Sequence, residues 1–398
     1  MTEGARRSFD QQRFFFIGTA SLLHLRGVER WLIEVASRFR NFTILTLSIG
    51  LHNIENIEEK KNEIKVLLKK IKRRNVEWHE LRALSLSDEN MSKIVPKPIA
   101  RFIKHSGIVM PLDLRILRLR RGIVYLVVGD FYTAVLLSTI LIACGVRKVI
   151  LGFHARPYIK RSAYVKPILT LMTKLSLLKG IHTVNIVDAL MIRGVLHNIP
   201  VWWIPNGVNC EQFKPSIKRS DKFQVLFVGA LIEEKGVDTF IEAAKIVKST
   251  YNDVEFLVAS VGGSLKSLVE GAHRDGVVTF LGFVPDDELA KLYAESHVVV
   301  LPSREEAFNL ISLEAQASGT PVIATDLPAF RQSVVNNMIG WLVKPYSPQV
   351  FAEAIIKIRS MWLNDRQKYE RMCVAARRNA ERYCWERIVK IYYKKLFK

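Results

Sequence analysis

The amino-acid sequence predicts an α/β protein built from two Rossmann-like, doubly wound parallel sheets. Three observations support this fold class. Apolar strand-like runs alternate with helix-length amphipathic segments along both halves of the 398 residues. Each half opens with an apolar strand and a glycine-containing loop. Proline, asparagine and glycine interrupt both periodicities in "WWIPNGVNCEQFKP" (202–215), so we expect one domain over residues 1–204 and another over 205–380.

The first half contains strand-like runs at 13–19 and 42–48 and an amphipathic helix at 28–39. The stretch "IVYLVVGDFYTAVLLSTILIACGV" (123–146) carries a single charge, Asp130, and is long enough to raise the question of a membrane span. Gly129 and Asp130 divide it into a short β-branched run and a helix-length segment, and "RKVILGFHA" then supplies another strand. This order predicts a buried strand–helix–strand unit in place of a membrane helix.

The second half repeats the alternation. Strands are expected at 223–229 and 254–260 with a helix at 237–249 between them. The segments "VVTFLGF", "DDELAKLYAES", "HVVVLPS" and "PVIAT" follow, with a helix holding Glu314 before the last of these strands. Ligands of such sheets bind at the carboxyl ends of the strands, so two facing sheets would place a substrate in the cleft between them.

Charge is distributed unevenly along the chain. Residues 1–200 hold 33 Lys and Arg against 15 Asp and Glu, whereas residues 201–398 hold 26 against 23. Most of the net charge of +21 therefore lies in the first half, including "KVLLKKIKRR" (65–74) and "RILRLRR" (115–121). Such a field attracts nucleic acid, anionic lipid or phosphorylated substrates, and a solvated basic surface is the plain alternative.

The cysteines and the start of the chain bear on its compartment. Cys144, Cys210, Cys373 and Cys384 have neither metal-ligand nor disulfide spacing, which favours a reducing compartment. The first residues contain no long apolar run of the kind found in signal peptides. We therefore expect a cytoplasmic protein.

Two acids stand eight positions apart in "SREEAFNLISLEAQASGTPVIA" (303–324), namely Glu306 and Glu314. Eight helical residues rise about 12 Å, whereas the two carboxyl groups of a glycosidase lie about 5 to 9.5 Å apart across one bond. The longer dimension suits a sugar, a diphosphate and a ribose together. Glu306 would then accept hydrogen bonds from the sugar and Glu314 from the ribose, with a helix N-terminus facing the phosphates.

Further motifs accompany this pair. "IPNGVNCEQF", "FVGALIEEKGVDTFIEAAKIV", "FLGFVPDDELAKLYAESHVVVLPSREEAFNLISLEAQASGTPVIATDLPAF" and "IGWLV" occur in this order over residues 204–345. Together they resemble the group-1 family of retaining glycosyltransferases, which has the two-domain GT-B fold and an E-x7-E signature. "GVERWLIEVA" (27–36) and "LGFHA" (151–155) are similar to that family's glycine loop and post-strand histidine. The resemblance implies that the last helix, 381–398, packs back on the first domain.

The resemblance implies roles for individual residues. Lys235 would bind the donor diphosphate and offset the charge that builds on the leaving nucleotide. His154 would donate a hydrogen bond near the anomeric centre, and Gly27 would let the backbone approach the phosphates. The catalytic group is thus expected to be His154, Lys235 and Glu306, and the donor-binding group Gly27, Gly229, Lys235, Glu306, Ala307, Phe308, Asn309, Leu310 and Glu314.

The chain also departs from the family pattern. Ala230 stands where the family usually has an arginine after the "VG" glycine, and the candidates to replace that cation are Arg156, Arg304 and Arg331. Arg26 replaces the first glycine of the N-terminal pair. The family's "EGFG" reads "EAFN", with Ala307 and Asn309, which bears on sugar preference.

The mechanism implied is retention of configuration without a protein nucleophile, through position and electrostatics. No cofactor and no metal are expected. The acidic run "DDE" (286–288) precedes a helical pattern and is interpreted as first-turn dipole stabilisation. Two alternatives remain: a GT-B sugar-nucleotide epimerase, which needs no acceptor, and a non-catalytic GT-B binding protein. The basic half favours the latter, although no nucleic-acid partner is expected because the basic runs lack interleaved aromatic residues.

The acceptor is inferred from the same charge. Residues 101–200 hold 15 Lys and Arg against 3 Asp and Glu, interleaved with apolar residues. A basic and apolar surface without a spanning helix is typical of a protein that lies on an anionic bilayer. We expect peripheral docking on a membrane and a lipid-linked or otherwise phosphorylated carbohydrate acceptor.

Overall fold

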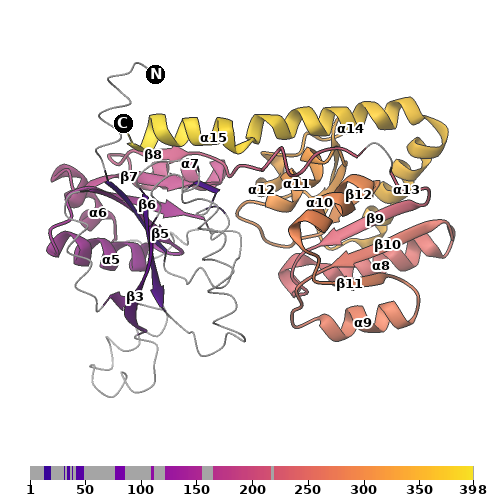
Figure 1. Ribbon diagram of the computed structural model, residues 1–398, viewed down its shortest axis with the longest axis horizontal. Helices are drawn as coiled ribbons and strands as arrows, with labels where there is room; N and C mark the ends of the chain where they lie inside the picture. The colour runs from indigo at the N-terminus through magenta and orange to yellow at the C-terminus, as the bar shows by residue number, and fades with distance from the viewer. Residues whose placement is uncertain are drawn as a thin grey trace. The chain divides into compact units, whose positions relative to one another are not determined.

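The computed structural model describes residues 13–18, 42–48, 77–85, 109–111, 122–154, 165–216 and 219–397, together with Trp31, Glu34, Val35 and Arg38 (Figure 1). The chain divides into two compact units. The first unit comprises residues 1–204 and 389–398, and the second runs from Pro205 to Ile388. Each unit is described separately below.

The described strands of the first unit form one sheet in the order β4-β3-β2-β1-β5-β6-β7-β8. All neighbours are parallel except β3 and β4. The strands are β1 (Arg13–Gly18), β2 (Phe42–Ser48), β3 (Glu77–Ser85), β4 (Val109–Pro111), β5 (Gly122–Val128), β6 (Val149–Phe153), β7 (Leu178–Thr183) and β8 (Val201–Trp203). The connecting helices are α5 (Phe131–Ala143), α6 (Val165–Lys174) and α7 (Ile186–Val195).

The apolar stretch after residue 122 is a strand and a helix, as the sequence predicts. Asp130 accepts hydrogen bonds from the amide and the hydroxyl of Thr133, at 2.9 and 2.7 Å, and so marks the start of α5. Alternate residues of β5 pack with α5, α6 and α7 in one core that includes Val124, Leu126 and Leu169. No helix in the described ranges is long and apolar enough to cross a bilayer.

The second unit contains a parallel sheet of order β11-β10-β9-β12-β13-β14. Its strands are β9 (Phe223–Val228), β10 (Val254–Ala259), β11 (Thr279–Gly282), β12 (Val298–Leu301), β13 (Val322–Thr325) and β14 (Gly340–Val343). The helical segments are η6 (Glu233–Lys235), α8 (Val237–Lys248), α9 (Lys266–Arg274), α10 (Asp286–Glu295), α11 (Leu310–Ala317), α12 (Pro328–Arg331), α13 (Pro348–Asn364) and α14 (Arg366–Ala380). Next come η7 (Glu381–Tyr383) and α15 (Trp385–Tyr392), then η8 (Tyr393–Phe397) in the first unit.

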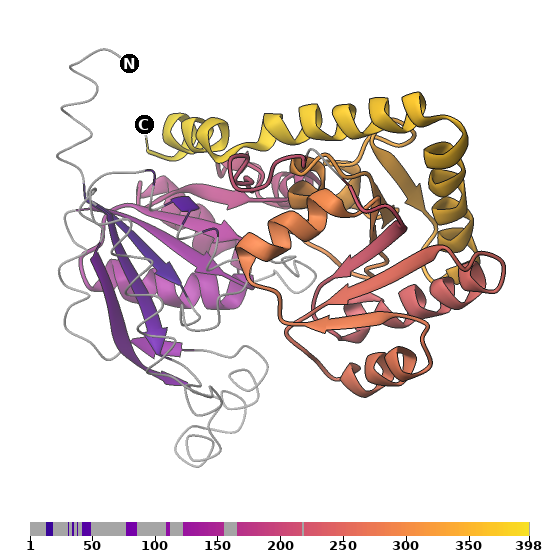
Figure 2. The ribbon, with the colours of Figure 1, turned by 45° about the vertical axis from the view of Figure 1, so that its right-hand side comes forward.

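Helices cover both faces of this sheet (Figure 2). Val225 and Phe227 of β9 pack with α8, α9 and α13, whereas Leu226 between them packs with α10 and α11. Successive side chains of a strand point to opposite faces, so near-continuous apolar strands are what a sheet with two covered faces requires. The pattern of the sequence therefore reflects burial on both sides.

The strand order reverses between β9 and β12. From β9 the chain proceeds outward to β10 and β11, and it then returns to place β12 on the other side of β9. Loops that follow two such neighbouring strands diverge to opposite faces and leave a crevice at the carboxyl ends of the strands, where doubly wound sheets bind ligands.

The prediction that the cysteines lack disulfide partners is wrong. Cys210 and Cys384 form a disulfide, with Cα atoms 5.6 Å apart and a sequence separation of 174. Local backbone pairing brings them together, because Val208 forms a parallel bridge with Cys384 and its amide donates to the Tyr383 carbonyl at 2.9 Å. Sequence spacing cannot show this contact, and the argument for a reducing compartment loses its basis.

Candidate functional site

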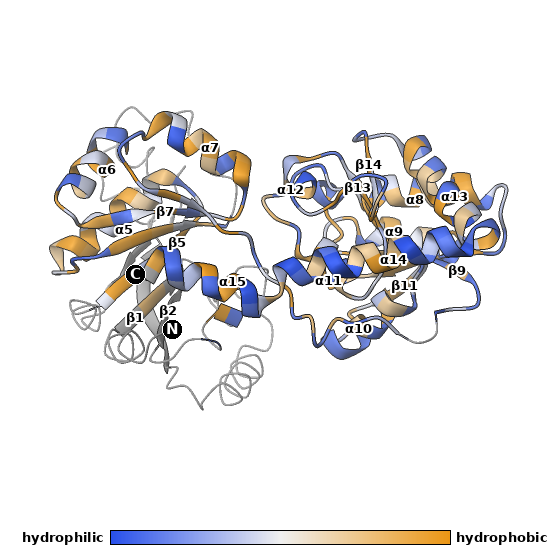
Figure 3. Cartoon of the chain, turned by 90° about the horizontal axis from the view of Figure 1, so that it is seen from above, coloured by the Kyte–Doolittle hydropathy of each residue, from blue (hydrophilic) through white to orange (hydrophobic). Residues whose placement is uncertain are grey.

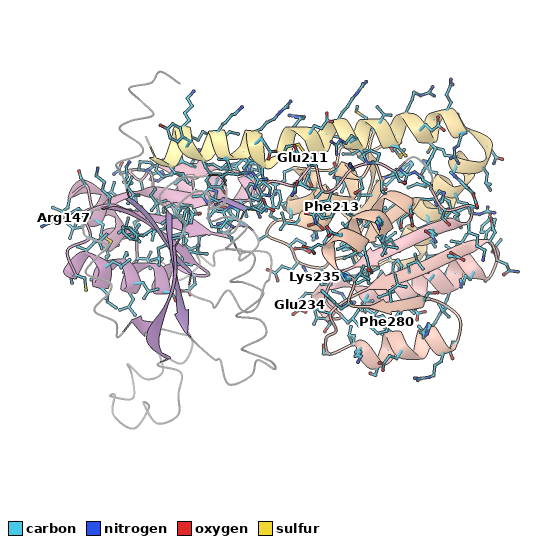
Figure 4. All side chains as sticks on the ribbon, in the orientation of Figure 1. Arg147, Glu211, Phe213, Glu234, Lys235 and Phe280 are labelled. Carbon is cyan, nitrogen blue, oxygen red and sulfur yellow. A yellow bond between two sulfur atoms is a disulfide. The ribbon has the colours of Figure 1, made fainter. Side chains whose placement is uncertain are left out.

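The loop after β9 carries Lys235. It begins at Gly229, and its last residues form the short helix η6 before α8 (Figure 4). Gly236, between η6 and α8, has φ of 69° and lies so close to the neighbouring loop that a Cβ would be 2.1 Å from the Pro302 carbonyl oxygen. Only glycine satisfies both conditions. The loop after β9 is therefore packed directly on the loop after β12.

The loop after β12 carries Glu306. This carboxylate is nearly buried, with 7% of its side chain exposed. Its Oε1 accepts hydrogen bonds from Ser303 Oγ at 3.1 Å and from Asn309 Nδ2 at 2.8 Å. Glu306 precedes the helix, since α11 begins at Leu310.

Lys235 and Glu306 form an ion pair in which Nζ lies 2.6 Å from Oε1. They are 71 residues apart in sequence and are joined because β9 and β12 are neighbours in the sheet. A second link between the loops runs from the Arg304 amide to the Glu234 carbonyl, at 2.8 Å. The side chain of Lys235 is more exposed than that of Glu306, at 28% against 7%, so a ligand can approach it from solvent. Charged donors on a buried carboxylate are among the stronger hydrogen bonds.

Glu314 lies on α11 and is buried. Its Oε2 accepts a hydrogen bond from the hydroxyl of Tyr293 on α10, at 3.0 Å. The start of the helix is capped by Asn309, whose Oδ1 accepts from the Ser312 amide at 2.8 Å. The same asparagine thus both begins the helix that carries Glu314 and contacts Glu306.

The remaining predicted residues of this site lie on the same two loops. Gly229 follows β9 with φ of 154°, and its amide donates to the Ala259 carbonyl at 3.2 Å. Ala307 and Phe308 lie between Glu306 and the capping residue, and Phe308 packs on the core beneath α11. Leu310 is the first residue of α11. The second unit therefore brings all of its predicted donor-binding residues to the loops after β9 and β12 and to α11.

His154 belongs to the first unit and follows β6 directly. Its ring is buried and tilted by 51° against the ring of Trp31, with centroids 4.1 Å apart, and its Nε2 lies 3.1 Å from the hydroxyl oxygen of Tyr125. Burial lowers the pKa of His154 well below its usual value, with a further contribution from His182, so the ring is neutral near pH 7. Gly27, Arg26 and Arg156 lie outside the described residues.

The arginines considered as replacements for the absent cation at Ala230 have other partners. Arg304 contacts Asp238 Oδ2 at 2.5 Å and the Glu233 carbonyl at 2.7 Å. Arg331 forms two hydrogen bonds with Asp326, at 2.6 and 2.8 Å.

The acidic run 286–288 forms the first turn of α10, where carboxylates stabilise the helix dipole, as expected. Within the described ranges no group of three or more histidine, cysteine, aspartate or glutamate side chains could hold a metal ion.

Sequence reasoning missed four residues that contact the predicted ones. Ser303 and Tyr293 bind Glu306 and Glu314, and Tyr125 and His182 form the surroundings of His154. Ser303 stands at the end of a predicted strand, a position that could have drawn attention to it. Nothing in the sequence singles out the other three.

A family model described as glycosyl transferases group 1 matches residues 209–379. A D-inositol 3-phosphate glycosyltransferase of Paenarthrobacter aurescens is 32% identical over 203 residues, 47% of this chain and 49% of the relative. An uncharacterized glycosyltransferase of Methanocaldococcus jannaschii is 31% identical over 207 residues, 50% of this chain and 52% of the relative. The alignments thus span about half the length of these relatives.

Solved structures agree over nearly the whole chain. HepE of Anabaena, crystallised with UDP and glucose, has a TM-score of 0.69 at 17% identity and covers 97% of this chain and 100% of its own. Sucrose-phosphate synthase of Thermosynechococcus elongatus has a TM-score of 0.66 at 18% identity, with 97% and 99% covered. At such identities the likeness establishes the fold: two parallel-sheet α/β domains of the GT-B type.

Proposed function

We propose that this chain is a retaining glycosyltransferase that moves a hexose-type sugar from a nucleotide-sugar to an acceptor hydroxyl. The observation that carries the proposal is the ion pair of Lys235 and Glu306 at the point where the strand order reverses. This pair lies inside the segment that matches the group 1 model. An adjacent cation and a carboxylate at such a crevice suit a ligand with both a diphosphate and sugar hydroxyls.

Each group has a distinct proposed role at the donor. The ammonium of Lys235, on a side chain that is 28% exposed, binds the diphosphate and remains close enough to Glu306 to offset its charge. The carboxylate of Glu306 accepts hydrogen bonds from the sugar. Glu314 binds the ribose, and Tyr293 holds that carboxylate in one orientation. A carboxylate fixed before the ligand arrives loses less conformational entropy on binding.

The reaction proceeds without a nucleophile from the protein. The acceptor hydroxyl attacks the face from which the phosphate departs, and an oxocarbenium-like state forms at the sugar. Negative charge grows on the leaving diphosphate, where Lys235 stabilises it. We propose that this lysine serves in place of a metal ion, so that the reaction needs no cofactor.

The acceptor is proposed to be lipid-linked or phosphorylated and presented at a membrane. The basic run 115–121 lies outside the described residues, but α6 offers independent support. Ile168 and Leu171 of α6 and Leu175 directly after it are 40%, 57% and 60% exposed and are spaced like residues on one helix face, and Lys166 and Lys174 are exposed residues of the same helix. Apolar and polar segments alternate along α6 and α7 (Figure 3). Exposed apolar residues flanked by lysines suit an anionic bilayer surface, and the cytoplasmic leaflet carries that charge.

Ligand-induced thermal stabilisation tests the donor proposal. The full chain would be heated with UDP-, GDP- and ADP-sugars, since a ligand that binds only the folded protein raises Tm by mass action. We expect one nucleotide series to raise Tm for the wild type and to lose most of that effect in Lys235→Ala. The absence of a shift with every nucleotide-sugar would contradict the proposal. The stabilising donor would then be incubated without acceptor, and conversion to its epimer would identify an epimerase.

A further inference from the structure

Tyr125 connects three elements of the first unit through its hydroxyl group. The residue lies on β5 with its ring buried, and its Oη contacts Nε2 of His154, after β6, at 3.1 Å. The same oxygen contacts Nδ1 of His182 on β7. One hydroxyl group therefore bridges the histidine predicted at the site and a second histidine that lies deeper in the sheet.

Gly152 on β6 makes this bridge possible. It lies on the strand between β5 and β7 and is paired in register with Val127 of β5 and with His182 of β7. A Cβ at this position would lie 2.1 Å from Tyr125 Oη. The tyrosine side chain thus occupies the space that a side chain at Gly152 would fill.

The hydrogen bonds run from His154 through Tyr125 and His182 to the carbonyl group of Ile204, and this carbonyl group decides where the protons lie. His182 Nε2 lies 2.9 Å from the carbonyl oxygen of Ile204, which can only accept, so Nε2 carries the proton. The other neighbour of Nε2 is the Tyr392 oxygen at 3.3 Å, which also accepts from Trp31 Nε1 at 3.0 Å. Burial lowers the pKa of His182 to about 4, so the ring is neutral and Nδ1 has a lone pair.

Tyr125 has a single hydroxyl proton, and it donates this proton to the His182 lone pair. Burial raises the pKa of Tyr125 well above its usual value, so the proton stays on the oxygen. The oxygen can then only accept from His154, which requires the proton of His154 to be on Nε2. His154 is neutral, so its Nδ1 has a lone pair, and this buried atom has no hydrogen-bond partner among the described residues.

We propose that Tyr125 is a positioning residue that holds His154 as the Nε2–H tautomer and so presents Nδ1 as an acceptor for a ligand hydroxyl group. His154 then accepts a hydrogen bond at Nδ1. The family resemblance had implied that it donates one. The tautomer follows from the protein alone. The hydroxyl-bearing ligand rests on the proposed function, because the substrates of a sugar transfer carry hydroxyl groups.

The first test reads the tautomer directly and needs no turnover. The full chain with 15N-labelled histidine would be studied at pH 7 by long-range 1H–15N NMR, with His154 assigned by the loss of its signals in His154→Gln. We expect protonated Nε2 and unprotonated Nδ1 for His154 in the wild type. In Tyr125→Phe this preference should weaken, because Nε2–H loses its acceptor. A wild-type His154 protonated at Nδ1 would overturn the proposal.

Matched variants separate positioning from general stability. Tyr369→Phe removes another buried hydroxyl group, which donates to the His297 carbonyl at 2.9 Å in the second unit. It should leave the His154 signals unchanged. Gly152→Ala should shift them as Tyr125→Phe does, because the added methyl group displaces the tyrosine hydroxyl. If Gly152→Ala does not fold, Tyr125→Phe alone decides.

The second test measures coupling in turnover. Loss of the hydrogen bond in Tyr125→Phe should reduce kcat/KM about five- to tenfold. Because Tyr125 acts through His154, adding Tyr125→Phe to His154→Gln should cause no further loss of kcat/KM. Adding Tyr369→Phe to His154→Gln should instead reduce kcat/KM by the same small factor as Tyr369→Phe does alone. Multiplicative effects of Tyr125→Phe and His154→Gln would overturn the positioning role. If the wild type has no activity, the proposed function fails while the NMR result still decides the tautomer.

Discussion

Asn309 joins the start of α11 to Glu306 through the two atoms of its amide group. Its Oδ1 accepts from the Ser312 amide at 2.8 Å, and its Nδ2 donates to Glu306 Oε1 at 2.8 Å. Asn309 stands where the group-1 family that this chain resembles has glycine. Glycine has no side chain and could form neither of these two hydrogen bonds. In this chain, one departure from the motif therefore supplies both a helix cap and a support for the predicted sugar-binding carboxylate.

Asn309 variants should separate these two functions. Asn309→Ser keeps a good cap but removes the donor to Glu306, so we expect nearly wild-type Tm and about a fivefold lower kcat/KM. Asn309→Asp also keeps the cap but places a second carboxylate against Glu306, and its loss should be larger. Thermal unfolding and steady-state kinetics measure the two effects. Equal kcat/KM for the wild type and both variants would show that the hydrogen bond from Asn309 to Glu306 does not contribute to turnover.

Donor binding should depend on Lys235 and Glu314. Truncation of a charged contact usually costs about 1.5 to 3 kcal/mol, so Lys235→Ala and Glu314→Ala should each weaken donor binding or turnover tenfold or more. Lys245→Ala is the matched control, because Lys245 forms an exposed ion pair with Glu242 on α8 at 2.7 Å. Titration calorimetry with the stabilising nucleotide-sugar provides the affinities. Wild-type affinity and turnover in both site variants would end their assignment.

The product should keep the anomeric configuration of the donor, and a chelator should have little effect. Both outcomes follow if the acceptor attacks the face that the phosphate leaves and Lys235 neutralises the diphosphate. Proton NMR of the first product formed reads the anomeric coupling, and EDTA is added to a parallel reaction. An inverted product would exclude the proposed mechanism, and loss of activity that Mg²⁺ restores would exclude metal independence.

Binding to anionic liposomes should depend on α6. Each basic residue near such a surface contributes about 1 kcal/mol, screened by salt. The double variant Lys166→Gln/Lys174→Gln should weaken co-sedimentation at low salt, Ile168→Ser/Leu171→Ser should weaken it at all salt concentrations, and neutralised 115–121 arginines should act like the lysine variant. Val374→Ser, at a half-exposed position of the second unit, is the control. Equal recovery in the supernatant for every sample would refute membrane docking.

Acid should destabilise the second unit partly through His297. Burial, with Arg219 and Arg366 nearby, lowers the pKa of His297 to about 3. The unfolded chain binds a proton at this histidine below about pH 6.5, whereas the folded unit does so only near pH 3. Its contribution to the free energy of unfolding is therefore complete above pH 6.5 and is lost progressively as the pH falls toward 3.

Urea unfolding of the full chain between pH 7 and pH 4 measures this loss. His297→Asn should flatten the dependence on pH, since the Asn oxygen can replace Nδ1 as acceptor for the Gln224 amide. His273→Gln, at an exposed position, should keep the wild-type slope. An unchanged slope in His297→Asn would show that this histidine does not contribute.

The sequence alone determined the elements and the fold class. Apolar runs bounded by glycine and proline predicted β9, α8, β10 and the strand–helix unit of β5 and α5, and the structure confirms them. It also placed Glu314 on a helix, which is α11. These features were readable because a strand buried on both faces and a helix buried on one each impose a local pattern on the chain.

Only the tertiary structure decided which distant residues meet. Lys235 contacts Glu306 because β9 and β12 are neighbours. Cys210 bonds Cys384 because the nearby Val208 pairs with Cys384, directly before α15. The surroundings of His154 depend in the same way on strand register, with Gly152 leaving room for the Tyr125 hydroxyl. Strand order and register are fixed by packing between segments that are far apart in sequence, so the local periodicity of the sequence does not predict them.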